Sequence, residues 1–224
     1  MSKPIIAIDG PAGAGKSTIA QTVADQLGYL YIDTGAMYRA VAWKVIENAI
    51  PLADHAKIVA LANKLKLRFE RIDSVQHIFT DGEDLTDAIR TPEATRLSSP
   101  VSAISGVRRK LVDIQRKIGE EGGIVMEGRD IGTVVFPNAE VKIFLTASAG
   151  ERAHRRVLQL KEQGIEADIE QIAEEIRERD LRDSSRSHAP LKQAADAVLL
   201  ETDSKTIEQV VDEVINIHNE KVNK

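Results

Sequence analysis

The sequence predicts an α/β fold in which a parallel β-sheet carries a small antiparallel insertion. Short, unbroken apolar runs such as Pro4–Ile8 are typical of parallel strands that are buried on both faces. Segments with apolar residues at helical spacing separate these runs, as in βαβ units. Residues 67–86 alternate loosely instead and contain Asp81-Gly82, a strong hairpin signal, so they predict an antiparallel meander.

The first elements form one βαβ unit. After Pro4–Ile8 and a run of glycines, apolar residues from Ile19 to Leu27 recur at helical spacing, and Gly28 fits a helix C-cap. Tyr29–Ile32 then predicts a second strand. Further helices are expected at 38–65 with a break near Pro51, 104–118, 150–163, 168–183 and 205–220. Further strands are expected at 67–72, 75–80, 83–86, 124–126, 141–145 and 197–200.

The composition excludes several classes of protein. The chain has 224 residues and a net charge of −5, which argues against a protein that mainly coats nucleic acid. The absence of cysteine excludes disulfides, thiolate catalysis and cysteine-ligated metals, and it fits a reducing cytoplasm. No apolar run approaches the roughly 20 residues of a membrane span, and Asp9 ends the first run too early for a signal peptide. We therefore expect a cytoplasmic protein built on a single core.

A glycine-rich motif follows the first strand. Residues 10–17, Gly-Pro-Ala-Gly-Ala-Gly-Lys-Ser, fit the P-loop pattern G-x-x-x-x-G-K-[ST]. Such glycines let backbone N–H groups surround a phosphate beside a helix N-terminus. Lys16 can then reach the β- and γ-phosphates, and the Ser17 hydroxyl can bind Mg²⁺. The glycine spacing differs from that of a dinucleotide fold, so we predict a nucleoside triphosphate site.

Three classes of P-loop protein compete. A GTPase needs a guanine-reading Asn-Lys-x-Asp, and the similar string at 63–66, Asn-Lys-Leu-Lys, lacks the aspartate. A transporter ATPase would carry a signature loop and a longer chain. A small-molecule kinase must instead surround the transferring phosphoryl group with cations and exclude water. The sequence favours this third class.

The distribution of arginine supports a kinase. Seven of the sixteen arginines lie between 152 and 186. Along the predicted helix 168–183 the apolar stripe continues onto Arg179, Asp183 and Arg186, where buried charge is costly unless it meets a polar or anionic group. Surface pairing within the helix, such as Arg179 with Asp183, is the alternative interpretation.

Polar residues also follow two of the predicted strands directly. Arg129 and Asp130 come after the strand at 124–126, and Thr34 and Arg39 come after the strand that ends at Ile32. Ligands of open α/β sheets bind at the carboxyl ends of the strands. These residues are therefore predicted to face a substrate, although a turn with a salt-bridged aspartate, or a helix N-cap, would give the same patterns.

Taken together, the motifs resemble those of the bacterial cytidylate kinases, a family of nucleoside monophosphate kinases, nearly end to end. The resemblance is carried by five strings: Ile8-Asp-Gly-Pro-Ala-Gly-Ala-Gly-Lys-Ser17, Asp33-Thr-Gly-Ala-Met-Tyr-Arg39, Gly128-Arg-Asp-Ile-Gly-Thr-Val-Val-Phe-Pro137, Glu151-Arg-Ala-His-Arg-Arg156 and Glu178-Arg-Asp-Leu-Arg-Asp-Ser-Ser-Arg186. It implies a P-loop nucleoside monophosphate kinase fold with a five-stranded parallel sheet, an antiparallel insertion and a lid. It also implies a monomer that transfers the γ-phosphoryl group of ATP to CMP or dCMP, with Mg²⁺.

The resemblance also implies roles for single residues. ATP would bind at Gly10, Pro11, Ala12, Gly13, Ala14, Gly15, Lys16, Ser17, Thr18 and Arg155. The acceptor would bind at Thr34, Tyr38, Arg39, Ser99, Arg108, Arg129, Asp130, Arg179, Asp183 and Arg186. The cations expected around the transferring group are Lys16, Arg129, Arg152, Arg156 and Arg179. The core would comprise 1–36, 96–150 and 189–224, the monophosphate-binding region about 37–95, and the lid about 151–188.

Two other functions stay open at this point. A P-loop kinase could phosphorylate another small acceptor, such as UMP, AMP or shikimate. A nucleotide-binding interaction protein without transfer activity is the alternative of a different class, and the intact Lys16 and the set of arginines argue against it.

Overall fold

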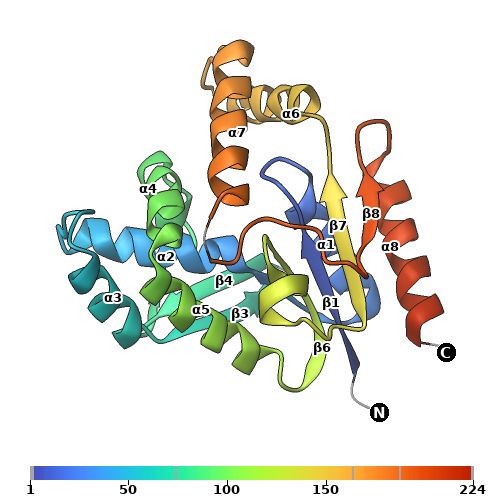
Figure 1. Cartoon of the computed structure of the whole chain (residues 1–224), viewed down its shortest axis with the longest axis horizontal. Helices are drawn as coiled ribbons and strands as arrows, with labels where there is room; N and C mark the ends of the chain where they lie inside the picture. The colour runs from blue at the N-terminus through green and yellow to red at the C-terminus, as the bar shows by residue number, and fades with distance from the viewer. Residues whose placement is uncertain (1–2, 74, 163, 187, 223–224) are drawn as a thin grey trace. The chain divides into compact units, whose positions relative to one another are not determined.

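The computed structural model describes residues 3–73, 75–162, 164–186 and 188–222 (Figure 1). Ser74, in the predicted turn between the strands 67–72 and 75–80, and Gln163, at the end of the predicted helix 150–163, lie outside the described residues. The chain forms two compact units. One comprises residues 1–31 and 121–224, and the other comprises residues 32–120.

The first unit contains the parallel sheet that the sequence predicts. The sheet has five strands in the order β2-β6-β1-β7-β8. These are β1 (Lys3–Asp9), β2 (Leu30–Asp33), β6 (Gly122–Gly128), β7 (Val141–Thr146) and β8 (Val198–Glu201). β1 lies at the centre and pairs in parallel with β6 on one side and β7 on the other. The carboxyl ends of β1, β6 and β7 therefore lie side by side, and each leads into residues of the predicted site.

One face of this sheet packs against two helices. Ile19 and Val23 of α1 (Lys16–Leu27) and Val214 of α8 (Ile207–Val222) are buried in the same core cluster as Ile6 and Ile143 of the strands. As predicted, α1 ends at Gly28, whose left-handed backbone suits glycine. The predicted helix of residues 205–220 is α8, displaced by two residues.

Two further helices of this unit pack against each other (Figure 1). α6 (Ala149–Glu162) follows β7, and α7 (Ile169–Ser184) begins after Asp168, whose side chain accepts hydrogen bonds from two N–H groups of the first turn. The predicted apolar stripe of α7 is only partly buried, because Ile169 is 46% exposed and Ile176 is 9% exposed.

The second unit is helical, with a small antiparallel sheet. Its helices are α2 (Thr34–Glu47), α3 (His55–Lys64), α4 (Pro92–Ala103) and α5 (Ser105–Ile118), with a short 3₁₀ turn, η1 (Ala88–Arg90). The sheet has the order β3-β4-β5, formed by β3 (Leu67–Ile72), β4 (Val75–Thr80) and β5 (Glu83–Asp84). The predicted meander is confirmed, although its third strand is shorter than expected. The Thr86 hydroxyl accepts a hydrogen bond from Ile78 and donates one to Asp84 instead of extending the strand.

Besides the short turn η1, two helical elements were not predicted. The first is α4. The sequence predicted a helix only from Ile104, whereas the structure already begins a helix at Pro92, capped by the Thr91 side chain. The second element is η2 (Ile131–Val135), one π-helical turn directly after Asp130. Such turns are rare and frequently occur at functional sites.

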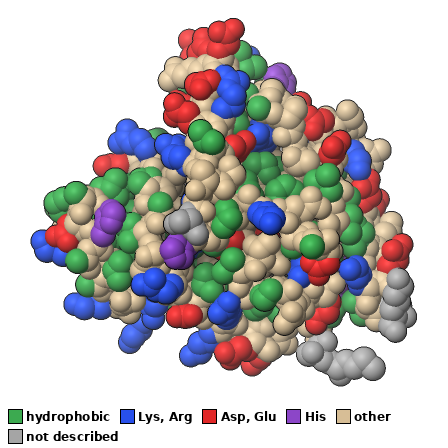
Figure 2. All heavy atoms as spheres, viewed as in Figure 1, with side chains coloured by type: hydrophobic (Ala, Val, Ile, Leu, Met, Phe, Trp, Pro, Cys, Tyr) green, Lys and Arg blue, Asp and Glu red, His purple; other side chains and the backbone are tan. Residues whose placement is uncertain are grey.

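Charge is unevenly distributed over the surface. On the face drawn in Figure 2, Lys and Arg side chains gather over α3 and α5, whereas Asp and Glu side chains gather over the N-terminal end of α7. Of the helices in the described part of the chain, none is both long and apolar enough to cross a membrane.

Candidate nucleotide-binding site

The predicted phosphate loop joins β1 to α1, as the motif requires. Three of its glycines, Gly10, Gly13 and Gly15, have positive φ angles of 150°, 80° and 87°. A Cβ at Gly10 would lie 2.0 Å from the carbonyl oxygen of Leu145 on β7. Gly10 therefore satisfies two requirements at once: a backbone conformation that other residues adopt poorly, and close contact with the neighbouring strand.

Replacing Gly10 with alanine is expected to destabilise the fold and distort the loop. The strained φ angle alone costs about 1–3 kcal/mol, and the contact with the Leu145 carbonyl adds to this. Gly150 provides a matched control, because a Cβ there would meet nothing within 4 Å. Thermal unfolding of both variants tests this prediction. Equal melting temperatures for Gly10→Ala and Gly150→Ala would contradict it.

Lys16 is buried at the start of α1, with 6% of its surface exposed. Its ammonium group donates a hydrogen bond of 2.7 Å to the carbonyl oxygen of Pro11, across the loop. Burial and the nearby positive charge of Arg129 lower the pKa of Lys16 to about 7, although Glu127 acts in the opposite direction. Without a nucleotide, this site therefore has too little negative charge to keep the lysine fully protonated at neutral pH.

This low pKa predicts that Lys16 takes up a proton when ATP binds. The phosphates bring negative charge beside the ammonium group and raise its pKa, so a lysine that is mostly neutral at about pH 8 becomes charged. Uptake should fall towards zero at about pH 6, where the lysine already carries its proton. Calorimetric titration in buffers of different ionisation enthalpy measures this uptake. Its persistence in Lys16→Met would contradict the assignment.

Ser17 and Thr18 occupy the first turn of α1, and both are exposed, as a ligand of Mg²⁺ or phosphate must be. Within the described part of the chain, no group of three or more His, Asp or Glu side chains is placed to bind a metal ion. The exposed Ser17 hydroxyl is an oxygen donor of the kind that fits Mg²⁺, which usually takes its other ligands from phosphate oxygens and water.

Arg152 contacts the phosphate loop. Its guanidinium group donates to the carbonyl oxygens of Ala147 at 3.0 Å and Ala12 at 3.1 Å, and it pairs with Asp180 of α7 at 2.6 Å. The Cβ of Arg152 also lies 3.1 Å from the position that a side chain at Gly13 would occupy. In this conformation Arg152 supports the loop and connects it to α7.

The three predicted lid arginines do not share one environment. Arg152 is buried, whereas Arg156 is exposed and donates a hydrogen bond to Gln159. Arg155 pairs with Glu151 and donates to both the hydroxyl and the carbonyl oxygen of Thr202, directly after β8. The role of Thr202 was missed from the sequence. Its position shortly after the predicted strand 197–200 was the available signal.

A second cluster of charge lies where β6 ends. Arg129 follows the strand and donates from Nε to Asp183 of α7 at 2.9 Å, and Arg186 donates to the other oxygen of the same carboxylate. Asp183 is only 2% exposed. Burial acts to raise the pKa of Asp183, but Arg129 and Arg186 outweigh it and lower the pKa below its ordinary value. Asp183 thus pairs with Arg129 of another element as well as with Arg186, which follows its own helix.

Two other predicted acceptor residues lie in the same unit. Asp130 is 5% exposed and precedes η2, and Arg179 is half-buried on α7. The positive charge of Arg179 contributes to the lowered pKa values of both Lys16 and Asp183. The first unit thus brings Lys16, Arg129, Arg179 and Asp183 into one electrostatic environment, whereas exposed Arg177 forms only a surface pair with Glu174.

The remaining predicted acceptor residues belong to the second unit. Thr34 is buried in the first turn of α2, and Arg39 on the same helix pairs with Asp33, its N-cap, at 2.8 Å. Arg108 is 5% exposed, lies over the ring of Tyr38 and donates to the carbonyl oxygen of Ser102.

Ser99 belongs to α4, the helix that the sequence did not predict. Its carbonyl oxygen accepts a hydrogen bond from the Ser102 hydroxyl at 2.7 Å. Ser99, Ser102, Arg108 and Tyr38 therefore form one connected group within the second unit.

Two buried carboxylates near Lys16 were missed as site residues. Glu127, near the end of β6, is 4% exposed and accepts a 2.5 Å hydrogen bond from the Tyr31 hydroxyl. Asp9, the last residue of β1, is also 4% exposed. Asp9 lies inside the recognised string that begins at Ile8, and Glu127 directly precedes the string that begins at Gly128, so their places in the sequence were the signal that could have found them.

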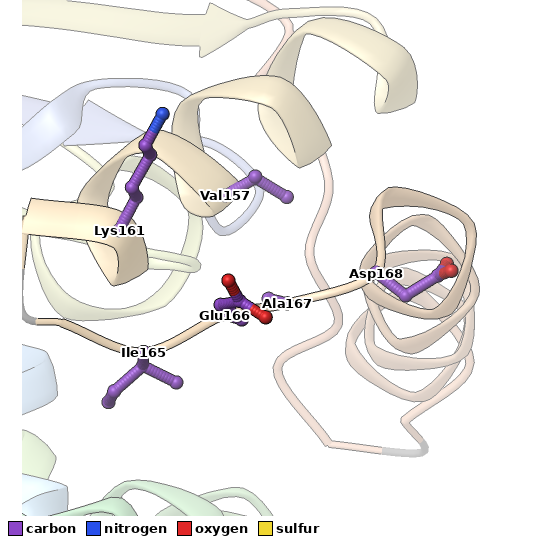
Figure 3. A pocket seen from close by; sticks show the side chains of 6 residues that line it. All are labelled: Val157, Lys161, Ile165, Glu166, Ala167 and Asp168. Atoms are coloured by element: carbon purple, nitrogen blue, oxygen red, sulfur yellow. The ribbon is translucent and has the colours of Figure 1, made fainter.

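A cavity of about 430 Å³ lies where α6 connects to α7 (Figure 3). Val157 and Lys161 of α6, Asp168 before α7, and Ile165, Glu166 and Ala167 between them line it. None of the predicted site residues is among them. Its mixed charges and distance along the chain from the phosphate loop give no reason to place a nucleotide there.

Comparison with known proteins identifies the family. The sequence profile of the family described as "Cytidylate kinase" matches residues 6–220. The chain belongs to the cytidylate kinase family. Named cytidylate kinases from Caldicellulosiruptor bescii and Enterococcus faecalis are 50% and 48% identical to this chain, over 97% and 99% of its length and 96% and 98% of theirs.

Other relatives extend the comparison. A bifunctional pantoate ligase/cytidylate kinase of Synechococcus is 50% identical, and this chain spans 41% of that longer protein. Among solved structures, the shikimate kinase from Acinetobacter baumannii in complex with shikimate matches with a TM-score of 0.51 at 13% identity, covering 99% of this chain and 96% of that one. At such low identity the likeness confirms the P-loop kinase fold alone, and within that fold this chain is a cytidylate kinase family member.

Proposed function

We propose that the protein transfers the γ-phosphoryl group of ATP to CMP or dCMP, releasing ADP and CDP or dCDP. Membership of the cytidylate kinase family supports the reaction class. The observation that carries the proposal is the buried Asp183 carboxylate with Arg129 and Arg186 paired to it, in the same unit as the phosphate loop. A kinase for a nucleoside monophosphate needs such a cationic cluster in addition to a triphosphate site.

At the donor site, backbone N–H groups of the loop bind the ATP phosphates. Lys16 exchanges its hydrogen bond with Pro11 for contacts to the β- and γ-phosphates. The exposed Ser17 hydroxyl is the protein ligand for Mg²⁺, which neutralises charge on the phosphate oxygens when it is bound. Glu127 is buried and its charge acts on Lys16, so it contributes negative charge where the cations gather.

At the acceptor site, the arginines bind the monophosphate and Asp130 selects the base. Arg129 and Arg179 supply fixed positive charge at the monophosphate, and Arg186 faces the cytosine together with Asp130. Asp183 orients the guanidinium groups of Arg129 and Arg186. Cytosine carries an exocyclic amino donor where uracil has a carbonyl acceptor. A carboxylate placed to accept from that amino group rejects the base that lacks it. Thr34, Tyr38, Arg39, Ser99 and Arg108 of the second unit are proposed to bind the acceptor as well, on the resemblance of their motifs to those of the family.

The reaction needs no general base, because the attacking phosphate oxygen of CMP is already ionised. Catalysis then depends on alignment of the two nucleotides and on cations around a loose transition state. The cations proposed to act in this way are Lys16, Arg129, Arg152, Arg156 and Arg179. Exclusion of water by the α6–α7 segment prevents hydrolysis of ATP.

A coupled assay of ADP release tests the proposal. The panel of acceptors is CMP, dCMP, UMP, AMP, GMP and shikimate, each with ATP and Mg²⁺, and chelation of Mg²⁺ is the matched control. Turnover with CMP and dCMP alone is the expected result. Preference for UMP or AMP would overturn the role given to Asp130, and turnover with none of them would overturn the kinase assignment. Sedimentation velocity tests the further proposal that the enzyme is a monomer.

A further inference from the structure

Asp9 lies at the junction between the phosphate loop and the proposed acceptor site. It is the last residue of β1, paired across the sheet with Gly128 of β6 and Phe144 of β7. The next residue is Gly10, which begins the loop. Because the side chain is 4% exposed, it neither reaches solvent nor is free to change partners.

Both oxygens of the Asp9 carboxylate accept backbone hydrogen bonds from the turn that follows β6. Oδ1 accepts from the N–H of Ile131 and Oδ2 accepts from the N–H of Gly132, each at 2.7 Å. These two N–H groups begin the π-helical turn η2, so they have no preceding carbonyl partner within it. The carboxylate thereby fixes the start of η2.

The residues immediately before this turn are Arg129 and Asp130. Arg129 reaches Asp183, and Asp130 is buried beside Asp9. A shift of η2 would therefore move a guanidinium and a carboxylate that the proposed function places on the acceptor. The loop itself has other supports that do not involve Asp9, namely the contacts of Arg152 with Ala12 and of Thr202 with Ala14.

We propose that Asp9 is a positioning residue for the acceptor nucleotide, acting through the backbone of Ile131 and Gly132 to set the orientation of Arg129 and Asp130. This inference rests on the proposed function. It explains why an acidic residue is buried here: a carboxylate offers two acceptor oxygens, whereas an asparagine offers one and would direct its NH₂ group at an N–H donor.

The charges that face Asp9 give this role a pH dependence. Burial raises the pKa of the Asp9 carboxyl to about 6, with Asp130 raising it further and Lys16 lowering it. The stem of Lys142 also packs beside Gly132, but its ammonium group pairs with Asp196. Asp9 is thus ionised at neutral pH and accepts both hydrogen bonds, and protonation at lower pH removes one acceptor.

The test is steady-state kinetics of Asp9→Asn in the full chain. We expect the KM for CMP to rise by roughly tenfold or more, because small displacements of positioning groups have large effects on reaction rates and binding, while the KM for ATP changes far less. Asp196→Asn is the matched control. It replaces another carboxylate that binds through both oxygens, to Lys142, outside the proposed site, and it should leave both KM values unchanged.

A second variant and a pH profile separate positioning from a purely structural role. Gly132→Ala would place a Cβ 3.2 Å from the Lys142 stem and at an ordinary contact distance, 3.4 Å, from Oδ2 of Asp9. The stem or the start of η2 must then shift by a few tenths of an ångström, so the KM for CMP should rise selectively, although less than in Asp9→Asn. The ratio of kcat/KM for CMP between wild type and Asp9→Asn should shrink from about pH 7 to about pH 5, as Asp9 of the wild type becomes protonated.

Three results would overturn the role of Asp9 and leave the proposed function intact: equal changes in the KM values for CMP and ATP, a fall in melting temperature with no change in either KM, or a kcat/KM ratio between wild type and variant that does not depend on pH. If Asp9→Asn does not fold, Gly132→Ala is the deciding variant. A rise in its KM for CMP without an equal rise in its KM for ATP would support the role of Asp9, and equal changes would overturn it. A wild-type protein that fails to phosphorylate CMP would overturn the proposed function and the role of Asp9 together.

Discussion

Lys16→Ala is expected to lower kcat by roughly 100-fold or more, the usual effect of removing a preorganised group that stabilises charge in a transition state. Lys16 is buried beside the phosphate loop, and its ammonium group donates to the Pro11 carbonyl at 2.7 Å. Lys16 is the one lysine in residues 10–18, so no neighbouring lysine of the loop can take over its role. The coupled ADP-release assay with ATP and CMP measures the effect.

Lys221→Ala provides the control for the general effect of removing a lysine, because Lys221 is exposed near the end of α8. It should retain full activity. Retention of wild-type kcat by Lys16→Ala would contradict the role assigned to Lys16. The proton uptake expected on ATP binding should disappear in the same variant, which gives a second, independent readout.

Asp183→Ala is expected to weaken CMP binding far more than ATP binding and also to destabilise the protein. The substitution leaves Arg129 and Arg186 without the carboxylate that orients both of them. Removing one partner of a buried ion pair typically costs about 3–5 kcal/mol, so a large fall in melting temperature should accompany the rise in the KM for CMP. Equal losses for CMP and ATP would place Asp183 outside the acceptor site.

The stability effect of Asp183→Ala has a definite dependence on pH. The two arginines make the pKa of Asp183 lower in the folded protein than in the unfolded chain. The ionised carboxylate therefore stabilises the fold fully at a pH above its unfolded pKa, and this stabilisation is lost as the pH falls through its lower folded pKa. The difference in stability between the wild type and the variant should therefore narrow in acid. Asp212→Ala, at an exposed position of α8, is the control and should show little difference at any pH.

Local patterns predicted most of the fold because they depend on neighbours in the chain. The apolar run before Gly10 predicted β1, the alternation of residues 67–80 predicted β3 and β4, and helical periodicity predicted α5. α4 could not be predicted in this way. Its serines and Pro100 favour loops locally, and the helix is stabilised by Ala94 and Val101, which are buried in contacts formed only by the folded unit.

In the site, too, features set by the local sequence were predictable, and features set by tertiary contacts were not. The phosphate loop and the strand-end position of Arg129 were predictable, because a motif and a rule of sheet topology locate them. The carboxylates that pair with the arginines could not be predicted. Asp183 pairs with Arg129, which lies 54 residues away in sequence, and Arg152 pairs with Asp180 at a separation of 28. Such pairs depend on tertiary geometry that spacing along one helix does not contain.

The position of Arg152 has a thermodynamic consequence. One guanidinium group touches both the carbonyl oxygen of Ala12 in the phosphate loop and Asp180, which is adjacent to Arg179 and one turn before Asp183 on α7. Through Arg152, a rearrangement of the loop around triphosphate can therefore reach the helix that carries the proposed acceptor residues Arg179 and Asp183. The two nucleotides should then bind cooperatively, and by reciprocity ATP must change the affinity for CMP by the same factor by which CMP changes the affinity for ATP.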